Sequence, residues 1–375
     1  MKGYLTLIFT LFVILLLGEK FRKRSFRNLS VKRKLNIDKM IFPGEEFKVT
    51  TEVENKEWAP IDFINLCEIY DTMLYRIGDT DVSIDEDSKY YYSSYSLAGR
   101  ERIKRTYRVK AERRGTFFLG NMYVVIGDVF SLEEETKDVE DFVEILIYPR
   151  IYKAKDIMFN NNSLQGDHMV KRWIYPDPLI IKGIREYTPY HRMKDIHWNS
   201  SAKTGKLMVR EYDYTSEKKI MFIMNTQFGN PYWSYIDKDG VDKIIEITMS
   251  LCDAIAKDGM EVGAMTNGQI VNYHGQGQYC VNPYSGSMGK ILELGARVDY
   301  TCNKELKDFF KEEKKKFDMN TVYVLVTAYM DKEIEGEIKS LSAKGYTLKI
   351  IDTSRDHKLP FIPNVEKIDY SGRRG

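Results

Sequence analysis

The pattern of apolar and charged residues singles out the first part of the chain. Residues 3–18 form an uncharged, strongly apolar run. As a helix this run would be about 24 Å long, slightly shorter than a hydrocarbon core of about 30 Å. Only Lys2 precedes the run, whereas a basic cluster follows it, namely Lys20, Arg22, Lys23, Arg24, Arg27, Lys32, Arg33 and Lys34. The positive-inside rule therefore predicts an N-terminal membrane helix with a basic flank over residues 1–24, and a cytoplasmic body.

Two alternatives to a single-pass protein with a cytoplasmic body remain open. A cleaved signal peptide would need a small-residue cleavage site, and no Ala-x-Ala-like site follows the apolar run. A periplasmic or extracellular body would place the basic cluster on the side of the membrane that such clusters avoid. The same cluster can contact anionic lipid. We therefore expect a cell-membrane protein, with the membrane as one of its partners.

Between residues 30 and 150 the apolar pattern has a period of two, as in strands with one buried face. One example is residues 47–53, where Phe47, Val49, Thr51 and Val53 alternate with polar or charged residues. Turn-forming pairs such as Pro43-Gly44 separate the short runs. This pattern predicts a small antiparallel β-sandwich over residues 30–150.

From about residue 218 strand-like apolar runs alternate with helical stripes. Examples are the run at 220–224, the helical pattern at 304–317 and the run at 322–326. Strands that alternate with helices predict an α/β domain with a mainly parallel sheet, here over residues 216–375. Residues 151–215 are the connecting segment, and their second half is rich in Arg, Tyr, His and Trp.

The composition excludes several classes of protein. Of the 375 residues, 43% are hydrophobic and 30% are charged, which is ordinary for a globular chain and excludes a disordered one. The net charge of +2 gives no reason to expect nucleic-acid binding. The four cysteines lie far apart without a C-x-x-C pair, so we expect free thiols and neither a disulfide framework nor a zinc site.

No complete catalytic motif is present. The chain has no Walker lysine and no G-x-S-x-G elbow, and Gly275-Gln276-Gly277 lacks the third glycine of a dinucleotide loop. His191 and His197 do not have the i, i+4 spacing of helical metal ligands. We therefore expect no catalytic residue and no cofactor. An enzyme is the alternative, supported only by Asp331 and Asp352 near predicted strand ends.

Several motifs occur in the order found in a known bacterial and archaeal family. They are Arg113-Arg114-Gly115, Gly127-Asp128-Val129-Phe130, Tyr148-Pro149-Arg150, Gly183-Ile184-Arg185-Glu186-Tyr187, Ile196-His197-Trp198, Ser201-Ala202-Lys203 and Leu207-Met208-Val209-Arg210-Glu211. Together they resemble the domain-of-unknown-function 58 family, over about residues 100–230 by motif and over the C-terminal part by pattern. The chain departs from the family at Tyr190-His191, where Gly-Asp is usual, and at Lys194 and Lys203, where arginine is common.

The resemblance implies a von Willebrand factor A-like C-terminal domain. The expected fold class is then α+β and multidomain, with an N-terminal membrane helix, a small antiparallel β-sandwich and a C-terminal α/β von Willebrand factor A-like (Rossmann-like) domain. In that fold an Asp-x-Ser-x-Ser motif at the end of the first strand can bind a metal. The corresponding positions are Asn225, Gln227 and Gly229, which supply neither the carboxylate nor the hydroxyls. We interpret this metal site as degenerate and expect no divalent metal.

The family signature supplies the candidate binding residues. They are Arg185, Tyr187, Lys194, Trp198, Lys203 and Arg210. Arginine and tryptophan often anchor interfaces, so these residues could form a cationic, aromatic docking surface, and arginine forks could also bind an anionic ligand. The structural alternative is that Trp198 and Tyr187 pack the segment between the two domains.

Members of the family are often linked with MoxR-type AAA+ ATPases, so the resemblance implies such a partner. We therefore expect a membrane-anchored, non-enzymatic interaction or scaffold protein, an adaptor for a MoxR-type AAA+ ATPase in assembly or maturation of membrane or envelope proteins. Other membrane or envelope proteins are further expected partners, and nucleic acid is not. The alternatives are a nucleotide- or metal-dependent enzyme on the α/β domain and an outward-facing adhesion module. Asn225 and the basic flank oppose the adhesion module.

Overall fold

The computed structural model describes most of the chain. The described residues are Tyr4, Phe9, Thr10, 24–37, 39–79, 82–85, 88–127, 134–159, 181–188, Met193, 196–212, 219–273 and 277–373. The chain divides into two compact units, residues 1–148 and residues 149–375, and each is described by itself. This division does not test the finer domain boundaries expected from the sequence, which stay a prediction.

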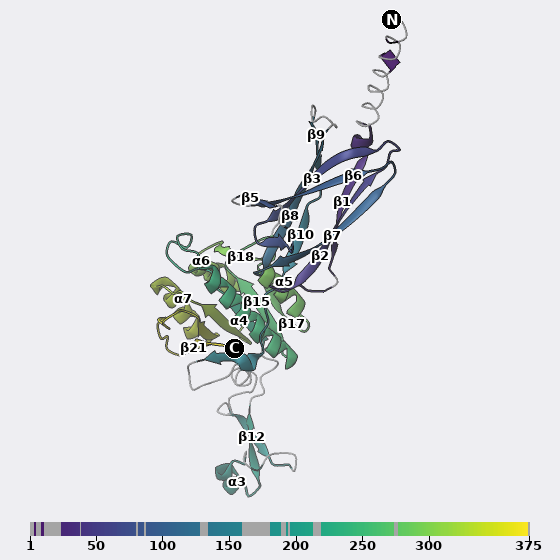
Figure 1. The fold of residues 1–375 in the computed structure, drawn as a ribbon. Coiled ribbons are helices and arrows are strands. Elements are labelled where there is room, and N and C mark those ends of the chain that lie inside the picture. The colour runs from purple at the N-terminus through teal and green to yellow at the C-terminus, as the bar shows by residue number, and fades with distance from the viewer. Residues whose placement is uncertain are drawn as a thin grey trace. The chain divides into compact units, whose positions relative to one another are not determined.

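The first unit contains two antiparallel sheets (Figure 1). One sheet has the order β1 (Leu29–Asn36), β2 (Glu46–Asn55), β7 (Arg102–Ala111) and β4 (Leu74–Arg76). The other has the order β10 (Val143–Ile147), β8 (Gly115–Gly127), β3 (Ile61–Asp71), β6 (Ser88–Leu97) and β5 (Val82–Ile84), with β9 (Glu134–Val139) paired to β8. Every strand pair in both sheets is antiparallel.

Alternation along the strands explains how these sheets form a core. In β2 the buried positions include Phe47, Val49, Thr51 and Val53, and the residues between them are more exposed. Apolar side chains of both sheets share two core clusters, one of which contains Val53 and Leu66 and the other Val49 and Tyr70. Burial of one face of each sheet against the other is the main stabilising term in such an arrangement.

A buried cluster of charged residues also joins the two sheets. Glu68 on β3 pairs with Arg76 on β4, and its Oε1 lies 3.4 Å from Nε of Arg33 on β1. The hydroxyl of Thr51 on β2 donates to the same Oε1 at 2.8 Å. The side chains of Glu68, Arg33 and Arg76 are all fully buried. The guanidinium of Arg76 also lies over the ring of Tyr107, 3.8 Å from its centroid.

The second unit contains a seven-stranded sheet. Its order is β11 (Ile157–Phe159), β21 (Glu366–Arg373), β20 (Thr347–Asp352), β19 (Thr321–Thr327), β14 (Lys219–Met224), β15 (Val262–Thr266) and β17 (Cys280–Tyr284). The strands from β21 to β15 run parallel, whereas the edge strands β11 and β17 are antiparallel to their neighbours. Further elements of this unit are η1 (Ala154–Asp156), β12 (Ile181–Glu186), α3 (Trp198–Thr204), β13 (Met208–Tyr212), α4 (Lys238–Lys257), β16 (Gly268–Ile270), α5 (Met288–Arg297), β18 (Val298–Cys302), α6 (Leu306–Glu313), η4 (Lys314–Lys316) and α7 (Lys332–Ala343).

Burial explains why the central strands carry continuous apolar runs. Every residue of β15 and β19 is buried, as expected for strands that are covered on both faces. Phe309 of α6 and Ile338 of α7 share one core cluster with Tyr323 of β19. Capping residues begin two of the helices, since Asp237 accepts from the backbone N–H of Gly240 and Asp331 accepts from that of Ile334.

The fold class expected from the sequence is wrong. The described residues are mostly β-sheet, from β1 to β21, with only a few helices between the strands. None of the helices within the described ranges is long and apolar enough to cross a membrane. The predicted membrane segment 3–18 lies outside these ranges except for Tyr4, Phe9 and Thr10. In the second unit the sequence also missed strands such as β16, because a three-residue strand shows no period.

Candidate functional site

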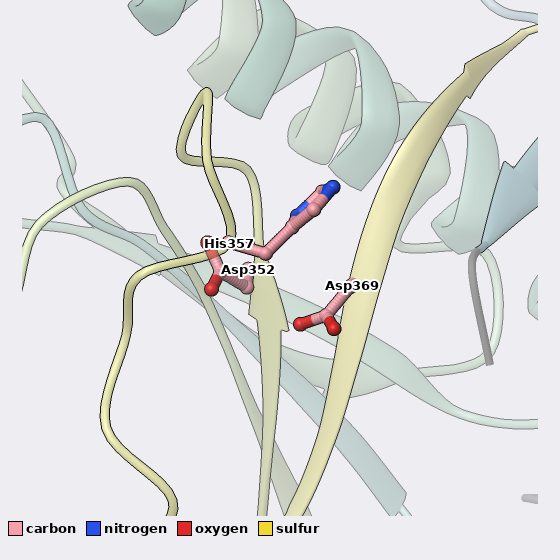
Figure 2. Close-up of side chains that lie close together, drawn as sticks. All are labelled: Asp352, His357 and Asp369. Carbon is pink, nitrogen blue, oxygen red and sulfur yellow. The ribbon is translucent and has the colours of Figure 1, made fainter.

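Three side chains that could bind a metal lie together where β20 ends (Figure 2). Asp352 is the last residue of β20, Asp369 lies on β21, and His357 lies in the connection between these strands. Asp352 and Asp369 are register partners on the neighbouring parallel strands, which places them side by side. One potential ligand atom of each residue lies within 4.8 Å of the other two. Carboxylate and imidazole are common metal ligands, so this group is the first candidate site.

Asp352 organises the loop that follows it. Its Oδ1 accepts hydrogen bonds from the backbone N–H of Ser354 at 2.9 Å and from the hydroxyl of the same residue at 2.6 Å. Its Oδ2 accepts from the backbone N–H of Leu359 at 3.2 Å. His357 has a φ of 52°, in the left-handed region, where the loop turns back. The buried carboxylate therefore has a structural role in shaping residues 353–359.

Lys367 on β21 brings a positive charge into the same group. Its Nζ lies 3.0 Å from Oδ2 of Asp352 and 3.3 Å from Oδ1 of Asp369. It also donates to the backbone carbonyls of His357 at 3.0 Å and Leu359 at 2.7 Å. Four oxygen atoms thus surround one ammonium group. We call Asp352, His357, Lys367 and Asp369 the charged cluster.

A second lysine borders the charged cluster from α4. Nζ of Lys243 donates to the backbone carbonyl of Thr353 at 3.1 Å. Burial lowers the pKa of Lys243, Arg355 acts in the same direction, and Asp237 and Asp352 act against them. The surroundings of the two carboxylates are therefore rich in positive charge.

The positions assigned to a degenerate metal site bind one another and their neighbours. Nδ2 of Asn225 donates to the hydroxyl of Thr327 at 2.8 Å, and its Oδ1 accepts from Nδ2 of Asn267 at 2.9 Å. Oε1 of Gln227 accepts from the backbone N–H of Leu306 at 2.9 Å. Nε2 of Gln227 donates to the backbone carbonyl of Gly229 at 3.0 Å.

These amides lie between β14 and β19, where the strand order reverses and ligands often bind in open parallel sheets. Asn225 both donates and accepts there, and an ionised carboxylate could only accept. The amides therefore link the ends of β14, β15 and β19 to the start of α6. The expectation that no divalent metal binds at these positions stays a prediction.

The family signature forms a small module of its own, which we call the signature module (181–188, Met193 and 196–212). In it β12 (Ile181–Glu186) pairs antiparallel with β13 (Met208–Tyr212), and α3 (Trp198–Thr204) precedes β13. Its buried apolar residues are Ile196 and Val209, which face each other in a β-bridge. Nδ1 of His197 caps α3 by accepting from the backbone N–H of Ser200 at 3.2 Å.

Several large apolar side chains of the signature module are exposed. Trp198 is 66% exposed, and Met193, Leu207 and Ile184 are also exposed. A Trp side chain carries one of the largest apolar surfaces of any residue, so this exposure is costly in water. Trp198, Leu207 and Ile184 lie within motifs that the sequence had singled out, whereas Met193 lies in none of them.

The structure places only some of the predicted binding residues. Arg185 and Lys203 are exposed, and Tyr187 is half-buried. Lys194 lies outside the described residues, and for Arg210 the structure describes the backbone in β13 but not the side chain. The structure therefore brings Arg185, Trp198 and Lys203 to one small module without testing their role in binding.

The four cysteines are free, as expected. Burial is the main cause that raises the pKa of both Cys280 and Cys302 to about 11. Burial also raises the pKa of Cys252 and Cys67. Thiols with a raised pKa are protonated near neutral pH, which makes them weak nucleophiles.

Comparisons with known proteins identify a family but no activity. The family model described as "Protein of unknown function DUF58" matches residues 183–373. An uncharacterised protein of Bacillus subtilis, YeaD, is 23% identical over 168 residues, which are 44% of this chain and 40% of that protein. The match therefore spans about two fifths of this curated relative's length.

Similar solved structures carry no argument about function, because their TM-scores are low. The CARDB domain of a Pyrococcus furiosus protein, in complex with di-metal ions, has 12% identity and a TM-score of 0.21, over 32% of this chain and 91% of that chain. The full-length major pilin SpaD of Corynebacterium diphtheriae has 10% identity and a TM-score of 0.24, over 32% of this chain and 34% of that chain. Neither the family match nor these structures identify a von Willebrand factor A-like domain, so that part of the expected fold is also corrected.

Proposed function

The chain belongs to the DUF58 family of proteins of unknown function, and we propose that it is a non-enzymatic interaction protein whose signature module binds a partner protein. The observation that carries this proposal is the exposure of Trp198, at 66%, in a module that also exposes Met193, Leu207 and Ile184. Exposed tryptophan residues are enriched among the residues that contribute most to binding energy at protein interfaces.

A partner that binds the signature module would bury the exposed apolar surface of Trp198. A Trp side chain presents up to about 250 Å², so exposure of two thirds leaves roughly 160 Å² that a partner could cover. At about 25 cal/mol per Å² this area corresponds to roughly 4 kcal/mol of favourable transfer before the costs of association. One residue of this kind can therefore decide whether a modest interface forms.

Charge on the signature module indicates the kind of partner surface that would fit. Lys206 pairs with Glu186 at 3.0 Å, so these two charges offset each other. Lys203 adds exposed positive charge. We infer a partner with an apolar pocket for Trp198 and an acidic rim, since complementary charge guides encounter and selects the partner.

The family resemblance supports a MoxR-type AAA+ ATPase as this partner. We propose that the chain acts as an adaptor for such an ATPase in the assembly or maturation of membrane or envelope proteins. The apolar run 3–18 and the basic residues after it support a location at the cytoplasmic side of the cell membrane. Other membrane or envelope proteins would then be within reach as clients.

Affinity purification of the tagged full-length chain from native membranes tests the proposal, with and without ATP. We expect an AAA+ ATPase to co-purify in one nucleotide state, and Trp198→Ala to reduce its recovery at least tenfold. Trp233→Ala is the matched control, because Trp233 is 68% exposed but lies outside the signature module. Equal recovery with folded Trp198→Ala and with wild type would refute docking through this module. Loss with Trp198→Ala of a partner that is not an ATPase would support the docking surface and refute the ATPase assignment.

A further inference from the structure

The charged cluster holds a lysine in the way that proteins hold a metal cation. Two carboxylate oxygens and two backbone carbonyl oxygens lie between 2.7 and 3.3 Å from Nζ of Lys367. Oxygen ligands of these two kinds are those that hard divalent cations also prefer. We propose that Lys367 is the resident cation of this site, so that the wild-type chain excludes divalent metal there and loss of the lysine opens a divalent-cation site.

The count of charges supports this assignment. Asp352 and Asp369 contribute two negative charges, and Lys367 contributes one positive charge between them. Without the lysine, the site would keep two carboxylates, the two carbonyl oxygens and the imidazole of His357. Such a set of oxygen ligands with one nitrogen ligand suits a divalent cation such as Mn²⁺.

The wild-type arrangement opposes metal binding by position as well as by charge. Both carboxylate oxygens of Asp352 are already engaged, since Oδ2 contacts Nζ of Lys367 at 3.0 Å and Oδ1 accepts from Ser354. A divalent ion among the same oxygens would lie next to the ammonium and be repelled by it. The side chain of Lys367 is only 15% exposed, and its two carbonyl contacts hold it to the loop after β20. Displacement of the lysine would therefore break several contacts at once.

The cluster thereby gains a structural role that needs no bound metal. Lys367 lies on β21, and the carbonyls that it binds belong to His357 and Leu359 in the preceding loop. The ammonium connects this loop to the sheet, as a metal ion connects ligands from separate segments in a structural site.

Mn²⁺ binding by the full-length chain tests the proposal, with free Mn²⁺ measured by electron paramagnetic resonance. We expect no saturable Mn²⁺ site in the wild type. Lys367→Met should have one site, whose affinity for Mn²⁺ is at least tenfold higher than any residual weak binding by the wild type. The double variant Lys367→Met with Asp352→Asn should lose this site. Lys349→Met is the matched control, because Lys349 is 17% exposed and also pairs with a carboxylate, Glu366, but lies outside the cluster.

Thermal unfolding with added Mn²⁺ provides a second measurement. A metal that binds only the folded state stabilises it by mass action, so Mn²⁺ should raise the Tm of the transition in which the second unit of Lys367→Met unfolds, and should not raise that of the wild type. If Lys367→Met does not fold, Lys367→Gln is measured in the same way. A folded lysine variant without a Mn²⁺ site would overturn the proposal. So would one Mn²⁺ bound by the wild type and lost with Asp352→Asn, since metal rather than lysine would then be the resident cation.

Discussion

The charged residues buried between the two sheets of the first unit allow a quantitative prediction for Glu68→Gln. The substitution preserves shape but removes the negative charge that two fully buried guanidinium groups share. Arg33 and Thr51 contact Oε1 of Glu68, whereas Arg76 contacts Oε2. The amide of glutamine can present an oxygen to only one of these sides. On the other side an N–H group would face a donor, so at least one contact is replaced by repulsion.

The expected loss of stability follows from the cost of an uncompensated buried charge. Removal of one partner of a buried ion pair typically costs about 3–5 kcal/mol. Burial alone would lower the pKa of Arg76, but the charge of Glu68 raises it on balance, which shows how far this guanidinium depends on Glu68. Contact with the Tyr107 ring and an ion pair with Asp79 would retain part of its stabilisation. We therefore expect the lower end of the range, about 3 kcal/mol.

Amide hydrogen exchange measures this loss locally. A chain of two units need not unfold in one step, so a single Tm is a poor measure of the first unit alone. At about 1.4 kcal/mol per factor of ten, a loss of about 3 kcal/mol should accelerate exchange of the most protected β3 amides roughly hundredfold. Peptides from the second unit should exchange as in the wild type.

Glu54→Gln is the matched control for the same chemistry at the surface. Glu54 accepts from Nη2 of Arg102 at 2.7 Å, but both side chains are partly exposed. Exposed pairs are typically worth less than about 1 kcal/mol, so exchange in β2 and β3 should change by a few-fold at most. If Glu68→Gln had no larger effect than Glu54→Gln, or slowed exchange, the buried pairs would not stabilise the sandwich as argued.

Two further predictions concern the second unit. Asp331→Ala should destabilise the C-terminal half by about 1 kcal/mol, because it removes the side chain that caps α7, and faster amide exchange in the first turn of α7 would show this. An unchanged rate there would contradict the capping role. Cys302 should react slowly with iodoacetamide at pH 8 and increasingly faster up to its pKa of about 11, as mass spectrometry of the labelled peptide would show. Because the thiol pKa is raised by folding from 9.0, this group should also favour the folded state less as pH rises from about 9 to 11. Rapid labelling of the folded chain at pH 8 would contradict the burial of this thiol.

The strands were readable where one face is buried and the other solvated. Phe47, Val49 and Val53 reveal β2 because each buried residue is followed by a more exposed one. The charged residues inside the same sandwich were not readable, because charged side chains are usually exposed. Glu68 and Arg33 are also far apart in sequence, at a separation of 35 residues. They meet only because β1 and β3 belong to the two different sheets whose inner faces pack against each other.

The candidate sites show the same limit. The sequence placed Asp352 near a strand end. Its neighbours Asp369 and Lys367 come after a long loop, so the sequence could not show which residues of β21 lie beside those of β20. Asp331 was considered as a site residue, yet it is a helix cap, and its position just before an amphipathic run is a capping signal. At Asn225 the missing carboxylate was evident from the sequence. The hydrogen bonds of its amide with Thr327 and Asn267 could be seen only once the structure placed the three strand ends side by side.

The charged cluster and the signature module differ in whether their side chains already have partners within the protein. In the charged cluster both Asp352 and Asp369 pair with Lys367, so any ligand must first replace an internal contact. In the signature module Trp198 leaves most of its surface in water, so a partner that covers it replaces only solvent. Binding is favoured where the free protein gives up least. For the proposed partner, Trp198 is therefore the described position where binding would cost the free protein least, whereas Lys367 of the charged cluster connects the loop after β20 to β21.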